Sequence, residues 1–232
     1  MSLHHNPRIV TDGLTFAFDP ADVNSYPGTG TVIKDLAGTV ADGTVVGASY
    51  SDNFHGIFDT DGTDDYLSFG SSATSLVQGK SAISMGIFFK LDATATLRGL
   101  IGTLNYSCSS NLGLVASGAS LNFYNDTTTC VSANIGSFVE TGKWIYAVGT
   151  YDGITTRTYG IKDGSLSKAH TATKTGNTNT FNSTFMIMCN HYSSYFTNGQ
   201  GSFCFVYNRA LSEAEILQNY NAHCTRLGLE HV

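Results

Sequence analysis

The chain has 232 residues, 41% of them hydrophobic, but only 13% are charged, so its surface must be covered largely by Ser, Thr, Asn and Gly. The formal net charge is −6, with 12 basic against 18 acidic residues, and this balance offers no basic stripe for the phosphates of a nucleic acid. No segment approaches the roughly 20 consecutive apolar residues that cross a bilayer, so we expect no membrane insertion.

The first predicted strand lies at residues 13–19, where Leu14, Phe16 and Phe18 alternate with other residues and share one face. A turn-rich stretch covers residues 20–30. Further strands are predicted, in chain order, at 31–36, 43–49, 56–59, 66–69, 82–91, 97–104, 112–116, 120–124, 130–133, 144–151, 157–161, 185–190 and 203–207. Residues 169–183 are rich in Thr and Asn and are expected to form a loop or a polar edge strand.

One helix is predicted, directly after the last strand. Ser212 and Glu215 have the spacing of a capping box, in which each side chain accepts a hydrogen bond from the other residue's backbone N–H. An apolar helical face follows, formed by Leu211, Ile216, Leu217 and Tyr220. This helix should therefore pack on the sheet. Trp144 opens an apolar strand and is expected in the core.

The fold class indicated is all-β, an antiparallel two-sheet sandwich or jelly roll closed by one short C-terminal helix, because short strands recur every 8–12 residues with no helical segment between them. No Pro-rich linker divides the chain, which has three prolines. We expect an N-terminal arm at 1–9, a single domain at 10–224 and a C-terminal tail at 225–232.

The N-terminal segment and the cysteines bear on the compartment. Residues 1–8 lack the apolar region of a secretory signal, so we expect synthesis in a cytoplasm. The five cysteines are odd in number and show no C-x-x-C spacing, which favours buried free thiols over a zinc site or a disulfide framework.

Three segments occur in the same order as in a known family: Thr60–Tyr66 (TDGTDDY), Trp144–Gly153 (WIYAVGTYDG) and Tyr207–Ile216 (YNRALSEAEI). Together they resemble the laminin-G-like jelly-roll domains of the concanavalin A-like lectin/glucanase superfamily, over residues 10–222. The resemblance implies two antiparallel sheets of about six strands each, one of them concave and able to carry a ligand.

A second resemblance concerns residues 4–14 (HHNPRIVTDGL) and 25–28 (SYPG), which look like segments of structural proteins of tailed phages, notably those infecting cyanobacteria. It implies an adhesion or decoration protein located on the virion and made in the host cytoplasm. The implied partners are other virion proteins, further copies of this chain and a host-surface polysaccharide.

The acidic residues argue against catalysis. Glucanases of the superfamily carry two glutamates and an aspartate on one strand, and a glycosidase needs a carboxylate pair about 5–10 Å apart. This chain has four glutamates, Glu140, Glu213, Glu215 and Glu230, and no such run. Asp64 and Asp65 are adjacent, and adjacent strand residues point to opposite faces. We therefore expect that the protein is not an enzyme and requires no cofactor.

The densest acidic cluster is the candidate metal site, formed by Asp59, Asp61, Asp64 and Asp65. Carboxylates and loop carbonyls provide the six to eight oxygen ligands that Ca²⁺ takes, and relatives of the fold often hold this ion. Turn formation through side-chain-to-backbone bonds is the alternative explanation of the same residues.

The candidate glycan site is a rim of two loops. Aromatic rings beside hydroxyl-binding side chains are typical of such sites, and the residues are Asn105, Tyr106, Asn190, His191, Tyr192 and Tyr195. In related domains, loops at matching places bind ligand at the sandwich edge. Two hypotheses stay open: a phage protein that recognises host-surface glycan through this rim, or a structural capsid, neck or tail protein whose loops contact other proteins.

Overall fold

The computed structural model describes residues 8–94, 97–103, 112–127, 130–172, 175–179, 183–189 and 195–232. Within them, sixteen strands form two antiparallel sheets. Sheet A has the order β14 (Ser165–Ala172), β13 (Thr155–Lys162), β12 (Trp144–Tyr151), β7 (Ile83–Leu91), β16 (Asn198–Tyr207), β5 (Ile57–Asp61) and β4 (Ser49–Ser51), and β1 (Leu14–Phe18) also pairs with β16. Sheet B has the order β11 (Cys130–Ile135), β10 (Ser120–Asp126), β9 (Leu112–Ser117), β8 (Arg98–Thr103), β15 (Phe185–Ile187), β6 (Tyr66–Gly70), β3 (Gly43–Val46) and β2 (Val32–Ile33).

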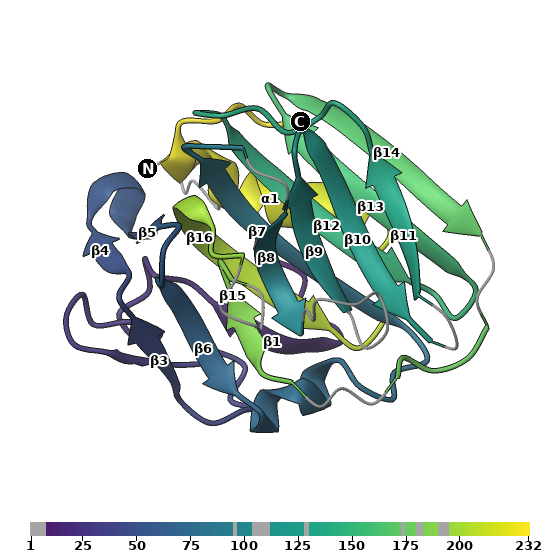
Figure 1. Cartoon of the computed structure of the whole chain (residues 1–232), viewed down its shortest axis with the longest axis horizontal. Helices are drawn as coiled ribbons and strands as arrows, with labels where there is room; N and C mark the ends of the chain where they lie inside the picture. The colour runs from purple at the N-terminus through teal and green to yellow at the C-terminus, as the bar shows by residue number, and fades with distance from the viewer. Residues whose placement is uncertain are drawn as a thin grey trace, which may run out of the picture.

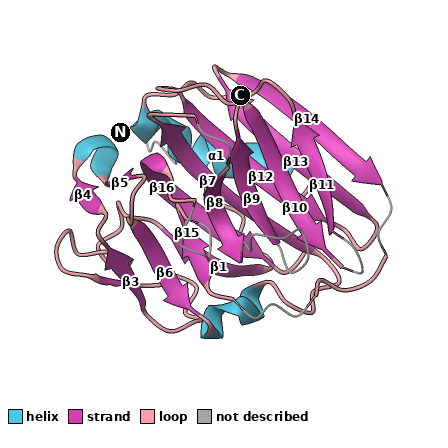
Figure 2. Cartoon of the chain, in the orientation of Figure 1, coloured by secondary structure: helices cyan, strands magenta, loops and turns pink. Residues whose placement is uncertain are grey.

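The two sheets stack face to face around an aromatic and aliphatic core (Figure 1). Alternate residues of each strand point into it, as the period of two requires. From sheet A come Phe16 and Phe89, and from sheet B come Phe69 and Phe123, all almost completely buried. The predicted all-β sandwich with one short C-terminal helix is confirmed, and strands dominate the chain (Figure 2).

A second apolar cluster covers the other face of sheet A. Here the helix α1 (Glu213–His223) packs against the outward side chains of β7, β12 and β16 through residues such as Ile216 and Tyr220. Because both faces of sheet A are covered, β12 is buried at every position, and β7 is apolar almost throughout. Trp144 is buried as predicted, in this outer cluster and not between the sheets.

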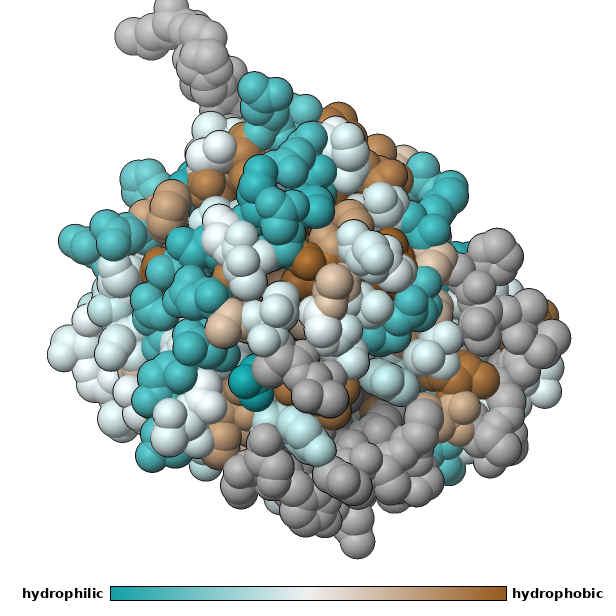
Figure 3. All heavy atoms as spheres, turned by 45° about the horizontal axis from the view of Figure 1, so that its top comes forward, coloured by the Kyte–Doolittle hydropathy of each residue, from teal (hydrophilic) through white to brown (hydrophobic). Residues whose placement is uncertain are grey.

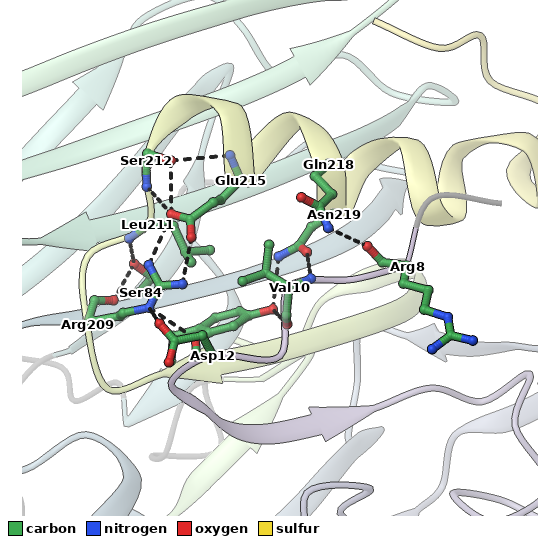
Figure 4. A network of polar contacts seen from close by, with 11 residues as sticks. Arg8, Val10, Asp12, Ser84, Arg209, Leu211, Ser212, Glu215, Gln218 and Asn219 are labelled. Carbon is green, nitrogen blue, oxygen red and sulfur yellow. Dashed lines mark hydrogen bonds and ion pairs between the residues drawn. The ribbon is translucent and has the colours of Figure 1, made fainter. Parts of the chain in front are cut away.

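Helix α1 begins as the sequence predicts. Ser212 is its N-cap, and both hydrogen bonds of the capping box with Glu215 are present (Figure 4). The face that it buries includes Asn219, which the pattern of apolar residues missed. Its side chain binds the N-terminal segment, accepting a hydrogen bond from the Val10 N–H at 2.8 Å.

Other features refine the predictions. Residues 165–172 form the edge strand β14, which overlaps the segment expected as a loop or polar edge strand. Two 3₁₀ helices, η1 (Asn53–His55) and η2 (Ser72–Leu76), interrupt the strands, and η3 (Cys224–Leu227) follows α1. Each sheet has eight strands within the described residues, more than the six that the family resemblance implied.

The expectation of free thiols is wrong for one cysteine. Cys204 and Cys224 are free and buried, and Cys189 is also buried. Cys130 is disulfide-bonded, to a partner outside the described residues. Disulfides persist mainly in oxidising environments.

The surface matches the composition. In the view of Figure 3, hydrophilic residues are interspersed with many of near-neutral hydropathy, and the coloured residues form no large continuous hydrophobic area. Among the described residues, no helix is long and apolar enough to span a bilayer.

Candidate functional site

An acidic cavity of about 370 Å³ opens at the edge of the sandwich. It lies where β5 ends and the chain turns towards β6, beside the start of β16 and of β4. Its walls are formed by Ser49, Asp59, Thr60, Asp61, Asp65 and Asn198. The cavity therefore draws on three adjacent strands of sheet A and on the turn that leads to sheet B.

Three carboxylates meet here. Asp61, Asp64 and Asp65 each place one oxygen within 4.8 Å of the other two. Asp61 and Asp64 are exposed, whereas Asp65 is buried. Asp59 lines the same cavity and accepts a hydrogen bond from Gln200 Nε2 at 3.1 Å. Carboxylate oxygens at this separation suit a hard cation such as Ca²⁺.

The electrostatics of the cluster are those of crowded negative charges. Burial raises the pKa of the Asp65 carboxyl, and the neighbouring charges of Asp61, Asp64 and Asp59 raise it further, while a hydrogen bond from the Asp61 backbone opposes the shift. A bound cation would remove this repulsion.

Turn chemistry is also present in the cluster. The Asp61 N–H donates to Asp65 Oδ2 at 3.0 Å, and the Thr63 N–H donates to Asp61 Oδ1 at 2.7 Å. Gly62 occupies the left-handed region with φ of 80°, which the turn requires. A metal site and a turn thus use the same residues, and the two explanations are compatible.

The argument that Asp64 and Asp65 point to opposite faces is wrong. Strand β5 ends at Asp61, so both residues lie in the turn, where the alternation of strand side chains does not apply. The turn folds the two carboxylates towards Asp61 and brings all three together.

Most residues of the predicted glycan rim lie outside the described part of the chain: Asn105, Tyr106, Asn190, His191 and Tyr192. Tyr195 is described and partly exposed. Directly after it, the Phe196 ring lies 6.1 Å from the Tyr66 ring, and the Thr197 carbonyl accepts a hydrogen bond from Thr60 Oγ1 at 2.7 Å. The next residue, Asn198, lines the acidic cavity, so the segment following the second rim loop forms one wall of the candidate metal site.

Ser49, Asn198 and Gln200 were missed by the sequence analysis. Ser49 lies on β4, the strand before β5, whereas Asn198 and Gln200 lie on β16, about 140 residues from Asp59 in the chain; strand pairing makes all three neighbours of β5. No local pattern marks a polar residue for such a role.

Comparisons with known proteins agree with this architecture. A family model described as concanavalin A-like lectin/glucanases superfamily matches residues 61–217. None of the curated protein sequences matches the chain.

Three solved structures illustrate the fold. Domain 4 of AbnA, an extracellular arabinanase from Geobacillus stearothermophilus, in complex with arabinotriose, is 12% identical with a TM-score of 0.63, covering 90% of this chain and 98% of that domain. The binding domain of botulinum neurotoxin serotype G is 13% identical with a TM-score of 0.63, covering 88% and 49%. A Trypanosoma rangeli sialidase in complex with sialic acid is 17% identical with a TM-score of 0.61, covering 92% and 33%, so this chain spans about a third of that enzyme.

These similarities overturn one expectation. We predicted from the fold and the acidic residues that the protein is not an enzyme. The comparisons contradict this prediction, because structures with a similar fold belong to a sialidase and an arabinanase. At 12–17% identity the likeness shows the fold and assigns no reaction to this chain.

Proposed function

Because this chain belongs to the concanavalin A-like lectin/glucanase superfamily, we propose that it is a carbohydrate-binding domain whose site lies at the sandwich edge around the acidic cavity. The observation that carries the proposal is that the acidic cavity lies next to the second loop of the predicted glycan rim. Asn198 lines the cavity, and it is three residues beyond Tyr195, the end of the second rim loop. The arabinotriose and sialic acid in the similar structures support a glycan as the ligand.

The proposal includes a Ca²⁺ ion held by Asp61, Asp64 and Asp65, with Asp59 at the side of the cavity. Such an ion would bind glycan hydroxyls directly and would fix the turn between β5 and β6. The rim residues Asn105, Tyr106, Asn190, His191, Tyr192 and Tyr195 would supply the aromatic faces and amide groups that contact the sugar.

The proposed setting is a phage virion, on which the protein adheres to host-surface polysaccharide. This part rests on the resemblance of residues 4–14 and 25–28 to structural proteins of tailed phages. Mass spectrometry of purified virions tests it. Absence of the chain from the particles would contradict a virion location and leave the binding proposal standing.

A thermal unfolding assay tests the metal. Addition of Ca²⁺ at about 100 times its Kd stabilises the folded state by about 2.7 kcal/mol, which raises the Tm of a domain of this size by roughly 5–10 °C. The paired substitution Asp61→Asn and Asp64→Asn should abolish the rise, whereas Asp42→Asn, an exposed aspartate outside the cavity, should retain it. An equal rise in all three proteins would contradict a site at this cluster.

A glycan array with and without Ca²⁺ tests the ligand. We expect binding that the double substitution Tyr192→Ala and Tyr195→Ala abolishes while the Tm changes little. A large fall in Tm would show that these tyrosines are packing residues. If the wild-type protein bound none of the host-surface glycans, the result would instead favour the purely structural role on a particle.

A further inference from the structure

A row of polar and aromatic side chains crosses sheet A beside the acidic cavity. Strand register places these residues directly opposite one another, in the order Ser49, Asp59, Gln200, Lys90 and Trp144. The adjacent row contains Phe58 and Phe89, which lie in the core between the sheets. Since alternate rows face opposite sides, the polar row lies on the outer face of sheet A.

Two atoms of this row are buried and have no hydrogen-bond partner: Gln200 Oε1 and Trp144 Nε1. The amide nitrogen of Gln200 is satisfied by Asp59, but its oxygen is not. Trp144 is only 7% exposed. Buried polar atoms in folded proteins are usually hydrogen-bonded, so this acceptor and this donor, in the same row, are available to a ligand.

Lys90 lies between these two residues. Its Nζ is 5.7 Å from the centre of the Trp144 ring, and within the described residues it forms no ion pair. At the other end of the row, Ser49 and Asp59 also line the acidic cavity. The row therefore extends the proposed site by a cation and an indole.

The 3₁₀ helix η1 (Asn53–His55) forms a short strap over the indole of Trp144. The Phe54 ring, on η1, lies edge-on to Trp144 with 5.8 Å between ring centres, and Phe54 itself is 38% exposed. Phe54 and His55 both have positive φ angles, 55° and 66°, which are unfavourable for residues with side chains. None of the three η1 residues is buried. Strained backbone of this kind clusters at functional sites, and all three residues of η1 are exposed.

We infer that Gln200, Lys90 and Trp144 form a second saccharide subsite, covered by Phe54 in this structure, that takes a sugar bearing a carboxylate. The ammonium of Lys90 pairs with the carboxylate, Gln200 Oε1 accepts a hydrogen bond from a hydroxyl, and the Trp144 ring packs against the C–H face of the sugar once Phe54 moves aside. The inference rests on the proposed function, because it assumes that the domain binds saccharide.

The chain contains a single tryptophan, so its fluorescence reports on this subsite alone. The probe is trigalacturonic acid, and the matched neutral probe is its fully methyl-esterified form. We expect the acid to change Trp144 emission in a saturable manner and to bind about tenfold more tightly than the ester, as a charge-assisted contact predicts.

Two variants locate the effect. Lys90→Met keeps the aliphatic stem and should remove the preference for the acid, whereas Lys34→Met, an exposed lysine elsewhere, should retain it. Phe54→Ala should shift the emission of the free protein to longer wavelength, increase quenching by acrylamide and tighten binding of the acid, because the strap no longer covers the ring.

The outcomes separate this inference from the proposed function. Equal binding of acid and ester by the wild-type protein would overturn the second subsite. A fluorescence change that EDTA abolishes but Lys90→Met leaves intact would overturn it as well. Both results would still be compatible with a glycan-binding domain. The second subsite would also be overturned if neither probe changed the Trp144 fluorescence while the array showed that the protein binds other glycans. Failure of every glycan on the array would instead overturn the proposed function.

Discussion

At the scale of single residues, the best-defined electrostatic contact is the pair of Arg209 and Glu215. Two parallel bonds join them, Nη1 to Oε2 at 3.0 Å and Nη2 to Oε1 at 2.6 Å, and Glu215 also closes the capping box with Ser212 (Figure 4). The hydrogen bonds from Arg209 are the main cause that lowers the pKa of Glu215 from 4.5 to about 2. One carboxylate thus joins the start of α1 to the segment that follows β16.

The lowered pKa of Glu215 means that the folded state favours its charged form. Its contribution to stability is complete above about pH 4.5 and is lost as the pH falls towards about 2. We expect Glu215→Gln to reduce the free energy of unfolding at pH 7 by about 1–2 kcal/mol, since the side chain is partly exposed. Chemical denaturation measures it, and a difference from wild type that persists unchanged at pH 2 would contradict the explanation.

At the scale of elements, a buried ring of hydrogen bonds joins α1 to the N-terminal segment and to β16. Val10 N–H donates to Asn219 Oδ1 at 2.8 Å, Asn219 Nδ2 donates to the Tyr207 hydroxyl at 3.1 Å, and that hydroxyl donates to the Val10 carbonyl at 2.5 Å. Since each group is satisfied by the others, removal of one member leaves buried polar atoms without partners.

We expect Asn219→Ala to lower the free energy of unfolding by about 2–4 kcal/mol and to increase amide exchange at Val10. Gln218→Ala is the matched control, because Gln218 is exposed and, among the described residues, its side chain makes one hydrogen bond, to the Arg8 carbonyl at 2.7 Å. Its effect should stay within about 0.5 kcal/mol. Similar losses for both variants, measured by denaturation, would show that the ring is not the stabilising feature.

At the scale of the whole molecule, the distance between the sheets depends on small residues facing large ones. Gly149 on β12 lies under the Phe123 ring of β10, and a Cβ added to Gly149 would come within 2.2 Å of that ring. Glycine at this position lets an aromatic side chain of sheet B reach the backbone of sheet A.

We expect Gly149→Ala to force the sheets apart and to cost about 1–3 kcal/mol, seen as a fall in Tm. Gly136→Ala is the matched control, because its nearest neighbour would be 3.7 Å from the new Cβ and its φ is not positive. An unchanged Tm for Gly149→Ala would contradict close packing at this point of the core.

Local patterns were sufficient for most strands and for the helix, but not for the three described 3₁₀ helices. The alternation of Phe16 and Phe18 and the spacing of Ser212 and Glu215 depend only on the periods of strand and helix, so the strand at 14–18 and the start of α1 could be predicted. The prediction that Leu14 shares the face of these two phenylalanines is wrong, because the register shifts between Leu14 and Phe16 and Leu14 packs in the outer cluster. The acidic cluster could be predicted for a similar reason, because Asp59, Asp61, Asp64 and Asp65 lie within seven residues, and the structure brings the carboxylates of Asp61, Asp64 and Asp65 together.

Only the tertiary structure decided which side chains from different strands become neighbours. Strand pairing places Asn198 and Gln200 beside Asp61 and Asp59. Trp144 lies on the outer face of sheet A, in the apolar cluster that includes residues of α1. Register across a sheet joins residues more than a hundred positions apart, and no short-range periodicity encodes it. The chain by itself therefore determined its class of fold and its acidic turn, while the shape of the cavity and its polar neighbours arose from long-range pairing.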